Sequence, residues 1–333
     1  MSFEYVQARD VSEAILMLRR YGDESRLLAG GTELLPNMRH HAISPKVLIN
    51  IKPIASLSYI KYEGNKRLKI GTLTPLRTIE RSSEIGKNHS LVSECVRSIA
   101  TLQVKNVGTI GGNLCQTVKC CYYNQSHINL FMRQSLEPCW QRGGSVCHAS
   151  RVDTLNHAIL GNPSRGCIAT TASDLATCLL AMDASIKVIG SVGEKLIRVE
   201  DFFSGGGRRK LQKDEMVTEI QIPPLEGTTQ GAYRKYSQGT RNYSILNAAV
   251  IARLTPDQKF CENIRAILGG VGVLPLRLRS VEARFMNREV GSLDVEEALM
   301  EDLKGARIRG DLSAYKLKRA KTMVSDVLHA VVG

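Results

Sequence analysis

The first fifty residues alternate between helical and extended hydrophobic patterns. Apolar side chains recur at helical spacing over residues 10–21, and a helical pattern resumes over residues 34–38. Between these segments, residues 26–29 predict a short strand. Residues 47–51 form a continuous apolar run, which is typical of a strand buried on both faces. This order predicts a small α/β unit that occupies residues 1–55.

A second region with helical and extended patterns follows over residues 56–222, and the double proline at Pro223-Pro224 ends it. Residues 68–71 form an extended segment at its beginning. Its further predicted elements are helices at residues 91–100 and 174–184 and strands at residues 185–189 and 216–222. Because proline interrupts strands and helices, we expect a domain boundary at the double proline.

The last part of the chain, residues 225–333, is predicted to be a separate domain. Its strand patterns come first, at residues 233–236, 248–253 and 264–273, and its helical patterns follow, at residues 280–287, 295–303 and 313–331. Strands followed by helices are typical of an α+β domain in which helices cover an antiparallel sheet. No catalytic motif is apparent there, so a packing or docking role is expected.

Residues 116–166 differ from the rest of the second region because they show no sustained periodicity. They are rich in Asn, Gln, Ser, Gly and His, as an inserted loop would be. A loop of this length inside a compact domain needs either a function or a fastening. We therefore interpret this segment as an insertion whose role lies outside the basic fold.

The composition is that of a folded globular protein. With 333 residues, of which 43% are hydrophobic and 23% charged, the chain can form two or three domains. Its charge of +13 comes from scattered bases and only 5% of its residues are aromatic, so nucleic-acid binding is not expected. An acidic electron carrier or acidic partner subunits would account for the charge. The absence of a signal region and of long apolar runs predicts a cytoplasmic protein without membrane insertion.

The cysteine pattern points to thiol or metal chemistry. Nine cysteines, an odd number without a secretory signal, favour thiols or metal ligands over disulfides. Cys95, Cys115, Cys178 and Cys261 are expected to be core thiols. The other five crowd the middle of the chain: Cys120, Cys121, Cys139, Cys147 and Cys167. Four thiolates on a metal cluster would fasten the insertion; a structural zinc site that includes His148, or simple free thiols, are alternatives.

Two glycine turns are candidate binding elements for a nucleotide. The first, at residues 30–32, lies between a predicted strand and a predicted helix, where unpaired amides and the helix dipole favour an anion. Taken alone, it could equally be a plain structural turn. At the second, Gly111-Gly112, a dinucleotide diphosphate could lie directly against the backbone. Since this turn leads into Cys120 and Cys121, we expect an organic cofactor and a metal centre close together.

Four short motifs are spread along the chain in a fixed order. They are LAGGTEL at residues 28–34, TPL at 74–76, VGTIGGNL at 107–114, and Ser173-Asp174 before an apolar helix. In this order and spacing they resemble the FAD-binding subunit of the xanthine dehydrogenase (molybdenum hydroxylase) family. The resemblance implies an α+β protein. Its two-part FAD-binding domain, of the vanillyl-alcohol-oxidase/PCMH type, would cover residues 1–222, and a C-terminal α+β domain of the medium-subunit type would follow.

The resemblance also implies which residues bind the cofactor. In this family both glycine turns hold the FAD diphosphate, and an aspartate at the position of Asp174 contacts the flavin nucleotide. Carried over by position, the expected FAD-binding residues are Leu28, Ala29, Gly30, Gly31, Thr32, Glu33, Leu34, Thr74, Gly108, Thr109, Gly112, Asn113 and Asp174. No catalytic residue is expected in this chain, because it has no pterin or substrate signature.

The cysteine segment points to one particular type of flavin subunit within this family. It is similar to the insertion in flavin subunits of the 4-hydroxybenzoyl-CoA reductase type, which holds an additional 4Fe-4S cluster. The implied ligands are Cys120, Cys139, Cys147 and Cys167, with Cys121 as the alternative first ligand. Cys120 is preferred because it keeps the family's spacing to residues 123–125. Cys147 and Cys167 are farther apart in sequence than the corresponding pair of the reductase.

Together these resemblances imply an electron-transfer subunit with FAD and a 4Fe-4S cluster. It would pass electrons between an external carrier, such as ferredoxin, and a 2Fe-2S small subunit, while the substrate reacts on a molybdenum-cofactor large subunit of a heterohexamer. One alternative is an ordinary xanthine-dehydrogenase-like flavin subunit whose insertion holds structural zinc or has no redox role. Another is a scaffold subunit that holds a nucleotide without redox turnover.

Overall fold

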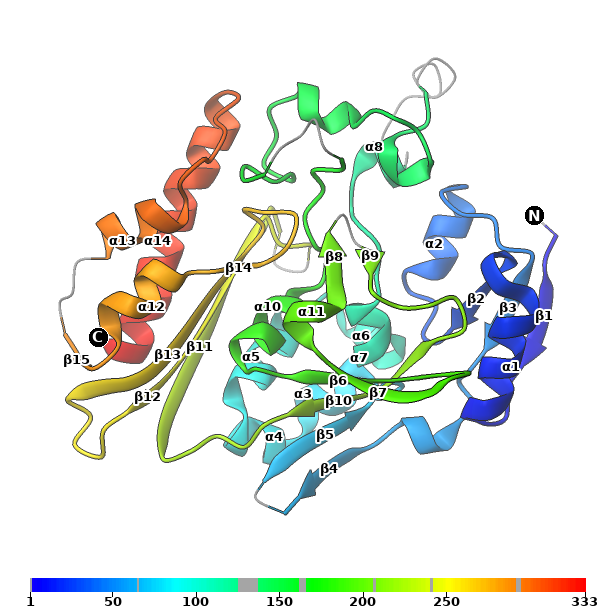
Figure 1. Cartoon of the computed structure of the whole chain (residues 1–333), viewed down its shortest axis with the longest axis horizontal. Helices are drawn as coiled ribbons and strands as arrows, with labels where there is room; N and C mark the ends of the chain where they lie inside the picture. The colour runs from blue at the N-terminus through cyan, green and yellow to red at the C-terminus, as the bar shows by residue number, and fades with distance from the viewer. Residues whose placement is uncertain are drawn as a thin grey trace.

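The computed structural model describes residues 2–64, 66–124, 137–161, 166–205, 208–239, 242–291 and 295–333. Within these ranges the chain forms three β-sheets with accompanying helices and a short two-stranded ribbon. Figure 1 shows the N-terminal sheet at the right, the central sheet in the middle and the C-terminal sheet at the left. This mixture of helices with parallel and antiparallel sheets confirms the predicted α+β class.

The N-terminal sheet consists of three parallel strands in the order β1-β3-β2. Its elements are β1 (Glu4–Gln7), α1 (Val11–Tyr21), β2 (Ser25–Leu28), α2 (Leu34–Arg39) and β3 (Val47–Asn50). The central strand β3 is buried throughout, as its unbroken apolar run predicts. Helix α1 contributes Ala14, Ile15 and Leu18 to the core that it shares with β3. The Asp10 carboxylate caps this helix by accepting a 2.8 Å hydrogen bond from the Glu13 amide.

The central sheet is antiparallel, with strand order β4-β5-β10-β6-β7. Its strands are β4 (Ile60–Glu63), β5 (Arg67–Gly71), β6 (Ser185–Gly190), β7 (Gly193–Arg198) and β10 (Met216–Ile222). The middle strand β10 pairs Ile220 with Ile70 of β5 and with Ile186 of β6. Residues 72–184 are therefore one long excursion from this sheet, and they contain both the second glycine turn and the insertion.

Short helices of this excursion pack on the central sheet. They are α3 (Leu76–Arg81), α4 (Ser83–Asn88), α5 (Ser90–Ser98), α6 (Leu102–Val107), α7 (Ile110–Leu114) and α10 (Asp174–Ala181). The remaining short elements of this part are η1 (Gly22–Glu24), η2 (Ala55–Leu57), α11 (Val199–Phe202), β8 (Phe203–Gly205) and β9 (Arg208–Arg209). Helix α10 is buried along almost its whole length, because it lies between the central and C-terminal sheets.

The C-terminal sheet is antiparallel and is buried on both faces. Its elements are β11 (Thr228–Tyr236), β12 (Leu246–Leu254), β13 (Phe260–Gly269), β14 (Leu276–Arg277), α12 (Arg279–Phe285), β15 (Arg288–Glu289), α13 (Glu296–Asp302) and α14 (Asp311–Val332). Because side chains alternate along a strand, Ala249 of β12 joins the core formed with α5 and α10, while Ala248 and Val250 join the core formed with α14. The C-terminal sheet thus shares a core with the part of the chain that carries the glycine turns.

The described residues of the insertion form short elements around a small core of their own. These elements are α8 (Cys121–Asn124), η3 (Trp140–Arg142) and η4 (His148–Arg151), and the core includes Val118, Tyr123, Ala149 and Ile168. Ordinary protein contacts also fasten the segment to α14. The Asp153 carboxylate accepts hydrogen bonds of 2.8 and 2.9 Å from the first amides of that helix, Leu312 and Ser313. Metal ligation is therefore not the only fastening available to this segment.

The long helix α14 is amphipathic, with a buried face that packs against the C-terminal sheet. Across the ranges that the structure describes, no helix has the length and apolar character needed to cross a membrane.

Candidate functional site

The two glycine turns lie against each other. A Cβ atom on Gly30 would come within 2.1 Å of the Val107 carbonyl oxygen and 2.9 Å of the Gly108 Cα. Only a residue without a side chain permits this approach between the two backbones. Gly31 follows with a φ of +71°, in the left-handed region that glycine adopts without strain. The two turns are far apart in the sequence but form one surface in the structure. Thr32 and Gly108 lie side by side on this surface.

The second turn is braced by the end of β5 and the segment that follows it. The Ile110 amide donates to the Thr74 carbonyl and the Gly111 amide to the Thr72 carbonyl, both at 3.0 Å. A Cβ on Gly111 would lie 1.8 Å from the Thr72 hydroxyl oxygen, so this position also requires glycine. The Thr109 hydroxyl caps α7 by accepting a 3.1 Å hydrogen bond from the Gly112 amide. These contacts hold the start of α7 in a fixed place.

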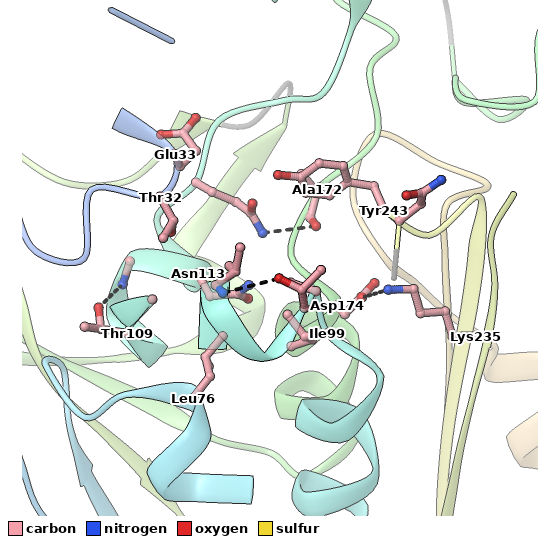
Figure 2. A pocket seen from close by; sticks show the side chains of 17 residues that line it. Thr32, Glu33, Leu76, Ile99, Thr109, Asn113, Ala172, Asp174, Lys235 and Tyr243 are labelled. Carbon is pink, nitrogen blue, oxygen red and sulfur yellow. Dashed lines mark hydrogen bonds and ion pairs between the residues drawn. The ribbon is translucent and has the colours of Figure 1, made fainter. Parts of the chain in front are cut away.

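A cavity of about 210 Å³ opens above the two turns (Figure 2). Its lining includes seven of the residues expected to bind FAD: Thr32, Glu33, Gly108, Thr109, Gly112, Asn113 and Asp174. At one end it is bounded by Leu76, Ile99 and Ala100. Ala100 has a φ of +45°, an uncommon backbone conformation for a residue with a side chain. Such local strain is found most often at functional sites.

A second cavity of about 520 Å³ continues from the first, with which it shares Thr32, Asn242 and Tyr243. It extends to Cys120 and Cys121 of the insertion. The two cavities form an elongated space that we call the cleft. Among the described residues, three of its side chains carry a buried polar atom without a partner: Asn37 Oδ1, Asn124 Oδ1 and His157 Nδ1. Because buried polar atoms normally have partners, the cleft suits a long ligand with polar groups, such as FAD.

Glu33 ties the first turn to the chain that leaves the second. Its carboxylate accepts hydrogen bonds from the Asn37 side-chain amide and the Thr117 hydroxyl, and one of 3.2 Å from the Thr117 backbone amide. The Lys119 ammonium lies 3.7 Å away. Much of this carboxylate's hydrogen-bonding capacity is therefore used within the protein, and Glu33 shapes the wall of the cleft at the point where the chain enters the insertion.

Asp174 connects the cleft to the C-terminal sheet. Its carboxylate lies 2.8 Å from the Lys235 ammonium, and both side chains are more than nine-tenths buried. It also accepts hydrogen bonds of 2.6 Å from the Ser244 hydroxyl and 2.8 Å from the Asn247 amide. The preceding residue, Ser173, donates a 2.8 Å hydrogen bond to the side chain of Asn113 in the second turn. Figure 2 shows Asp174 and Lys235 facing each other at the wall of the cavity.

The other residues expected to bind FAD do not line the cleft. The buried Thr74 hydroxyl donates to the Tyr59 carbonyl at 2.9 Å and accepts from the Tyr59 amide at 3.0 Å. The other residues outside the lining of the cleft belong to the first turn and its flanks: Leu28, Ala29, Gly30, Gly31 and Leu34. They build the turn beneath the cleft, and direct contact between them and FAD stays a prediction.

Sequence patterns do not reveal the C-terminal side of the cleft. Lys235, Asn242 and Tyr243 all line it, although a packing or docking role is expected for their segment. One signal was available, because a lysine within an otherwise half-buried strand needs a partner. The partner, Asp174, could not be identified without the tertiary structure. Lys235 also donates a 3.1 Å hydrogen bond to the Ser98 carbonyl, beside the strained Ala100.

The four cysteines expected to bind a cluster come together in the insertion. They line one small space with Tyr122, Tyr123, Trp140, Gln141, His148 and Ala149: Cys120, Cys139, Cys147 and Cys167. Cys121, the alternative first ligand, is absent from this lining and faces the cleft instead. Cys120 borders both spaces. The geometry thus favours Cys120 over Cys121 as the member of the cysteine-lined space, in line with the preference from sequence spacing.

Each of these four cysteines is followed by a tight turn. The Tyr123, Arg142 and Ser150 amides donate to the backbone carbonyls of Cys120, Cys139 and Cys147 at 3.0, 2.7 and 3.0 Å. The Ala169 amide donates a 3.4 Å hydrogen bond to the Cys167 sulfur, which stabilises negative charge there. The core thiol of Cys178 instead donates to the Leu91 carbonyl. The four cysteines fit a thiolate-bound metal cluster in their chemistry and in lining one space.

The thiols interact in pairs. The hydrogen bond from Cys167 lowers the pKa of Cys147 to about 6, and the hydrogen bond from Cys120 does the same for Cys121. No group of three or more His, Cys, Asp or Glu side chains in the described ranges is arranged around a single metal ion. The space between the sulfurs is about 10 Å³, so a bound cluster would have to separate Cys147 from Cys167.

Comparison with known proteins gives a family for most of the chain. The family model described as "FAD binding domain in molybdopterin dehydrogenase" matches residues 1–225. This range contains the two glycine turns, Asp174 and the whole insertion. The match thus spans the residues on which the resemblance was based and ends just after the double proline.

Individual relatives extend the similarity over the C-terminal sheet. The chain is 26% identical over 334 residues to the carbon monoxide dehydrogenase medium chain of Hydrogenophaga pseudoflava, covering 98% of this chain and 96% of that protein. It is 28% identical over 291 residues to the aldehyde oxidoreductase FAD-binding subunit PaoB of Escherichia coli (strain K12), covering 85% and 86%. In the solved carbon monoxide dehydrogenase of H. pseudoflava, a chain with 24% identity has a TM-score of 0.75 and covers 99% of this chain. At that identity the structural match shows the fold alone.

Proposed function

This chain belongs to the family of FAD-binding domains in molybdopterin dehydrogenases, and from that premise we propose that it is the electron-transfer subunit of a molybdenum-dependent complex, with FAD and a 4Fe-4S cluster as its two redox groups. Family membership makes it an oxidoreductase subunit with FAD as its cofactor. The cluster, the partner subunits and the residues that hold each redox group are our proposals beyond family membership.

The cleft and its glycine turns support the assignment of the FAD-binding residues. The backbone of Thr32, Gly108 and Gly112 borders open space for the diphosphate, and Thr109 fixes the start of α7 beside it. When bound, the flavin supplies the conversion between two-electron and one-electron transfer. Asp174 and Lys235 close the wall with an ion pair, so the wall carries no uncompensated buried charge. We assign residues 1–222 to the FAD-binding domain, with subdomains 1–55 and 56–222, and residues 225–333 to the C-terminal domain.

One observation carries the proposed cluster: four cysteines line a single space, and the Ala169 amide donates a hydrogen bond to one of their sulfurs, that of Cys167. Such a cluster supplies one-electron transfer, and its potential depends on hydrogen bonds to the sulfurs and on solvent exposure. The side chains of Tyr122, Tyr123 and Trp140 also line this space. The position of the cysteines between the second turn and Asp174 supports a kinship with subunits of the 4-hydroxybenzoyl-CoA reductase type.

We propose the following partners. The molybdenum cofactor would reside on a large subunit, and a 2Fe-2S small subunit would exchange electrons with the flavin. An external carrier such as ferredoxin would complete the route, and the net charge of +13 suits an acidic carrier. The names of the relatives, carbon monoxide dehydrogenase medium chain and aldehyde oxidoreductase FAD-binding subunit, support a role as one subunit among several. Nine free cysteines suit a reducing compartment, and we propose the cytoplasm.

Metal and flavin analysis of the full chain tests this function. The protein should be purified without oxygen, reconstituted with FAD, iron and sulfide, and examined by its visible spectrum. We expect flavin bands together with about four irons per chain. Flavin with zinc and no iron would favour the alternative, an ordinary flavin subunit with a structural insertion. A colourless chain that binds neither flavin nor iron would end the proposal.

A further inference from the structure

His157 lies directly beside the cysteine expected to be the first ligand. Its Nε2 atom is 3.2 Å from Cys120 Sγ, and both residues are buried. Its other ring nitrogen, Nδ1, has no hydrogen-bond partner among the described residues. A neutral imidazole carries one N–H donor and one acceptor nitrogen. When Cys120 is a thiolate, as a metal ligand must be, a hydrogen on Nε2 gives the sulfur a donor, whereas the other tautomer would place two acceptors face to face and bury an unpaired N–H.

Helix α14 holds His157 in this place from the opposite side. The Lys316 ammonium, which is completely buried, donates hydrogen bonds of 2.8 Å to the His157 carbonyl and 2.7 Å to the Leu155 carbonyl. The Arg309 guanidinium donates a 2.8 Å hydrogen bond to the carbonyl of the next residue, Ala158. The backbone on both sides of the imidazole is therefore anchored to the C-terminal part of the chain. The backbone that carries the ring cannot move away from Cys120 unless these contacts break.

The tautomer also restricts what His157 can do. With its hydrogen on Nε2 and directed at sulfur, the ring is a hydrogen-bond donor toward Cys120. That nitrogen then has no lone pair with which to bind a metal ion.

We propose that His157 is a positioning residue of the 4Fe-4S site, which orients Cys120 and raises the reduction potential by donating its Nε2 hydrogen to the Cys120 sulfur. This inference rests on the function proposed above. Reduction by one electron from the external carrier adds one negative charge to the cluster and its thiolates, and no bond forms or breaks. A hydrogen bond to a coordinating sulfur is stronger when that sulfur carries more negative charge. The donor therefore stabilises the reduced state more than the oxidised state.

Two substitutions separate the hydrogen bond from simple packing. His157→Leu fills a similar volume without an N–H group, whereas His157→Gln keeps an amide N–H at a similar distance from the backbone. The hydrogen bonds from Lys316 are made to backbone carbonyls, so neither substitution removes their acceptors. His89→Leu is the matched control, because His89 is also buried but contacts Tyr62 and Pro223, and none of the three lines the cysteine space.

The experiment is an anaerobic redox titration of each reconstituted full-length variant, followed by electron paramagnetic resonance of the reduced cluster and by iron analysis. In His157→Leu we expect the ratio of reduced to oxidised cluster at a fixed potential to fall about tenfold, which equals a downward shift of about 59 mV for one electron. His157→Gln should recover most of this loss, and His89→Leu should match the unmodified protein. Loss of iron in His157→Leu with recovery in His157→Gln would equally support the positioning role.

Other results overturn the inference, and they differ from those that overturn the proposed function. If the unmodified chain binds iron but His157→Leu keeps its midpoint potential, the imidazole does not act on the cluster. If both His157 variants lose iron while remaining folded by circular dichroism, an amide donor cannot replace the ring and the hydrogen-bond explanation is wrong. If the unmodified chain itself binds no iron, the cluster assignment fails before His157 is tested.

Discussion

The Asp174 carboxylate and the Lys235 ammonium form a buried ion pair, 2.8 Å apart, that joins the start of α10 to β11 of the C-terminal sheet. The pair lies in the wall of the cleft, beside Ser98 and the strained Ala100. Since Ser244 and Asn247 also bind the carboxylate, Asp174 receives donors from three C-terminal residues. The shape of the cleft thus depends on how the two parts of the chain are packed.

Removing one partner of this pair should destabilise the protein strongly. In Lys235→Met, Asp174 keeps its buried charge without a cation, and such losses cost about 3–5 kcal/mol. Lys213→Met is the matched control, because Lys213 pairs with Asp23 on the surface and exposed pairs contribute less than about 1 kcal/mol. Urea unfolding gives both free energies, and the FAD content of each variant shows whether the cleft survives. Equal stability of the two variants would contradict this role of the pair.

The close approach of the two turns predicts that Gly30 cannot carry a side chain. In Gly30→Ala the new methyl group would meet the Val107 carbonyl oxygen at 2.1 Å and force the turns apart. We expect a loss of about 1–3 kcal/mol in stability together with weaker FAD binding. Gly86→Ala in α4 is the control, because nothing lies within 4 Å of its Cβ position. It should stabilise the helix by about 0.5–1 kcal/mol. Fluorescence titration measures the affinity of each variant for FAD. An undiminished affinity in Gly30→Ala would show that the turns can separate without loss of binding.

The cysteine assignment predicts different results for neighbouring substitutions. Cys139→Ser should lose iron but keep FAD, because Cys139 lines the cysteine space and not the cleft. Cys121→Ser should keep its iron, since Cys121 faces the cleft and lies outside that space. Iron and flavin analysis of the two purified variants tests this assignment. Unchanged iron in Cys139→Ser, or its loss in Cys121→Ser, would require a different ligand set.

Buried His89 predicts a dependence of stability on pH. Burial lowers the pKa of His89 below its ordinary value of 6.5. Between the pKa of His89 in the folded chain and its pKa in the unfolded chain, the unfolded chain binds more protons than the folded chain. The contribution of His89 to stability is therefore complete above pH 6.5 and is lost as the pH falls below that value. The slope from this residue reaches at most about 1.4 kcal/mol per pH unit. His89→Gln should show a shallower decline between pH 7 and pH 5 in urea unfolding. Parallel curves for the two proteins would mean that His89 titrates normally.

Much of the secondary structure could be predicted because its signal is local. The apolar run at residues 47–51 reappears as the central strand β3, and residues 216–222 form β10 with the predicted bounds. The pattern does not reveal the strands β1, β4 and β7, because they contain only exposed and partly buried residues. The strand predicted over residues 264–273 ends earlier, at Gly269, because Gly270 has a φ of +88° and turns the chain.

The sequence by itself determined which chemical groups this chain has available: two turns that require glycine, an aspartate before an apolar helix, and a segment dense in cysteine. These properties depend on residue type and on spacing over a few residues, so they can be identified from their resemblance to family motifs. Only the tertiary structure decided that Gly30 touches Val107, that Lys235 is the partner of Asp174, and that His157 reaches Cys120 while α14 holds its backbone. Each of these contacts joins residues far apart in the chain. Their meeting depends on how sheets and helices share a core, and no local pattern contains that information.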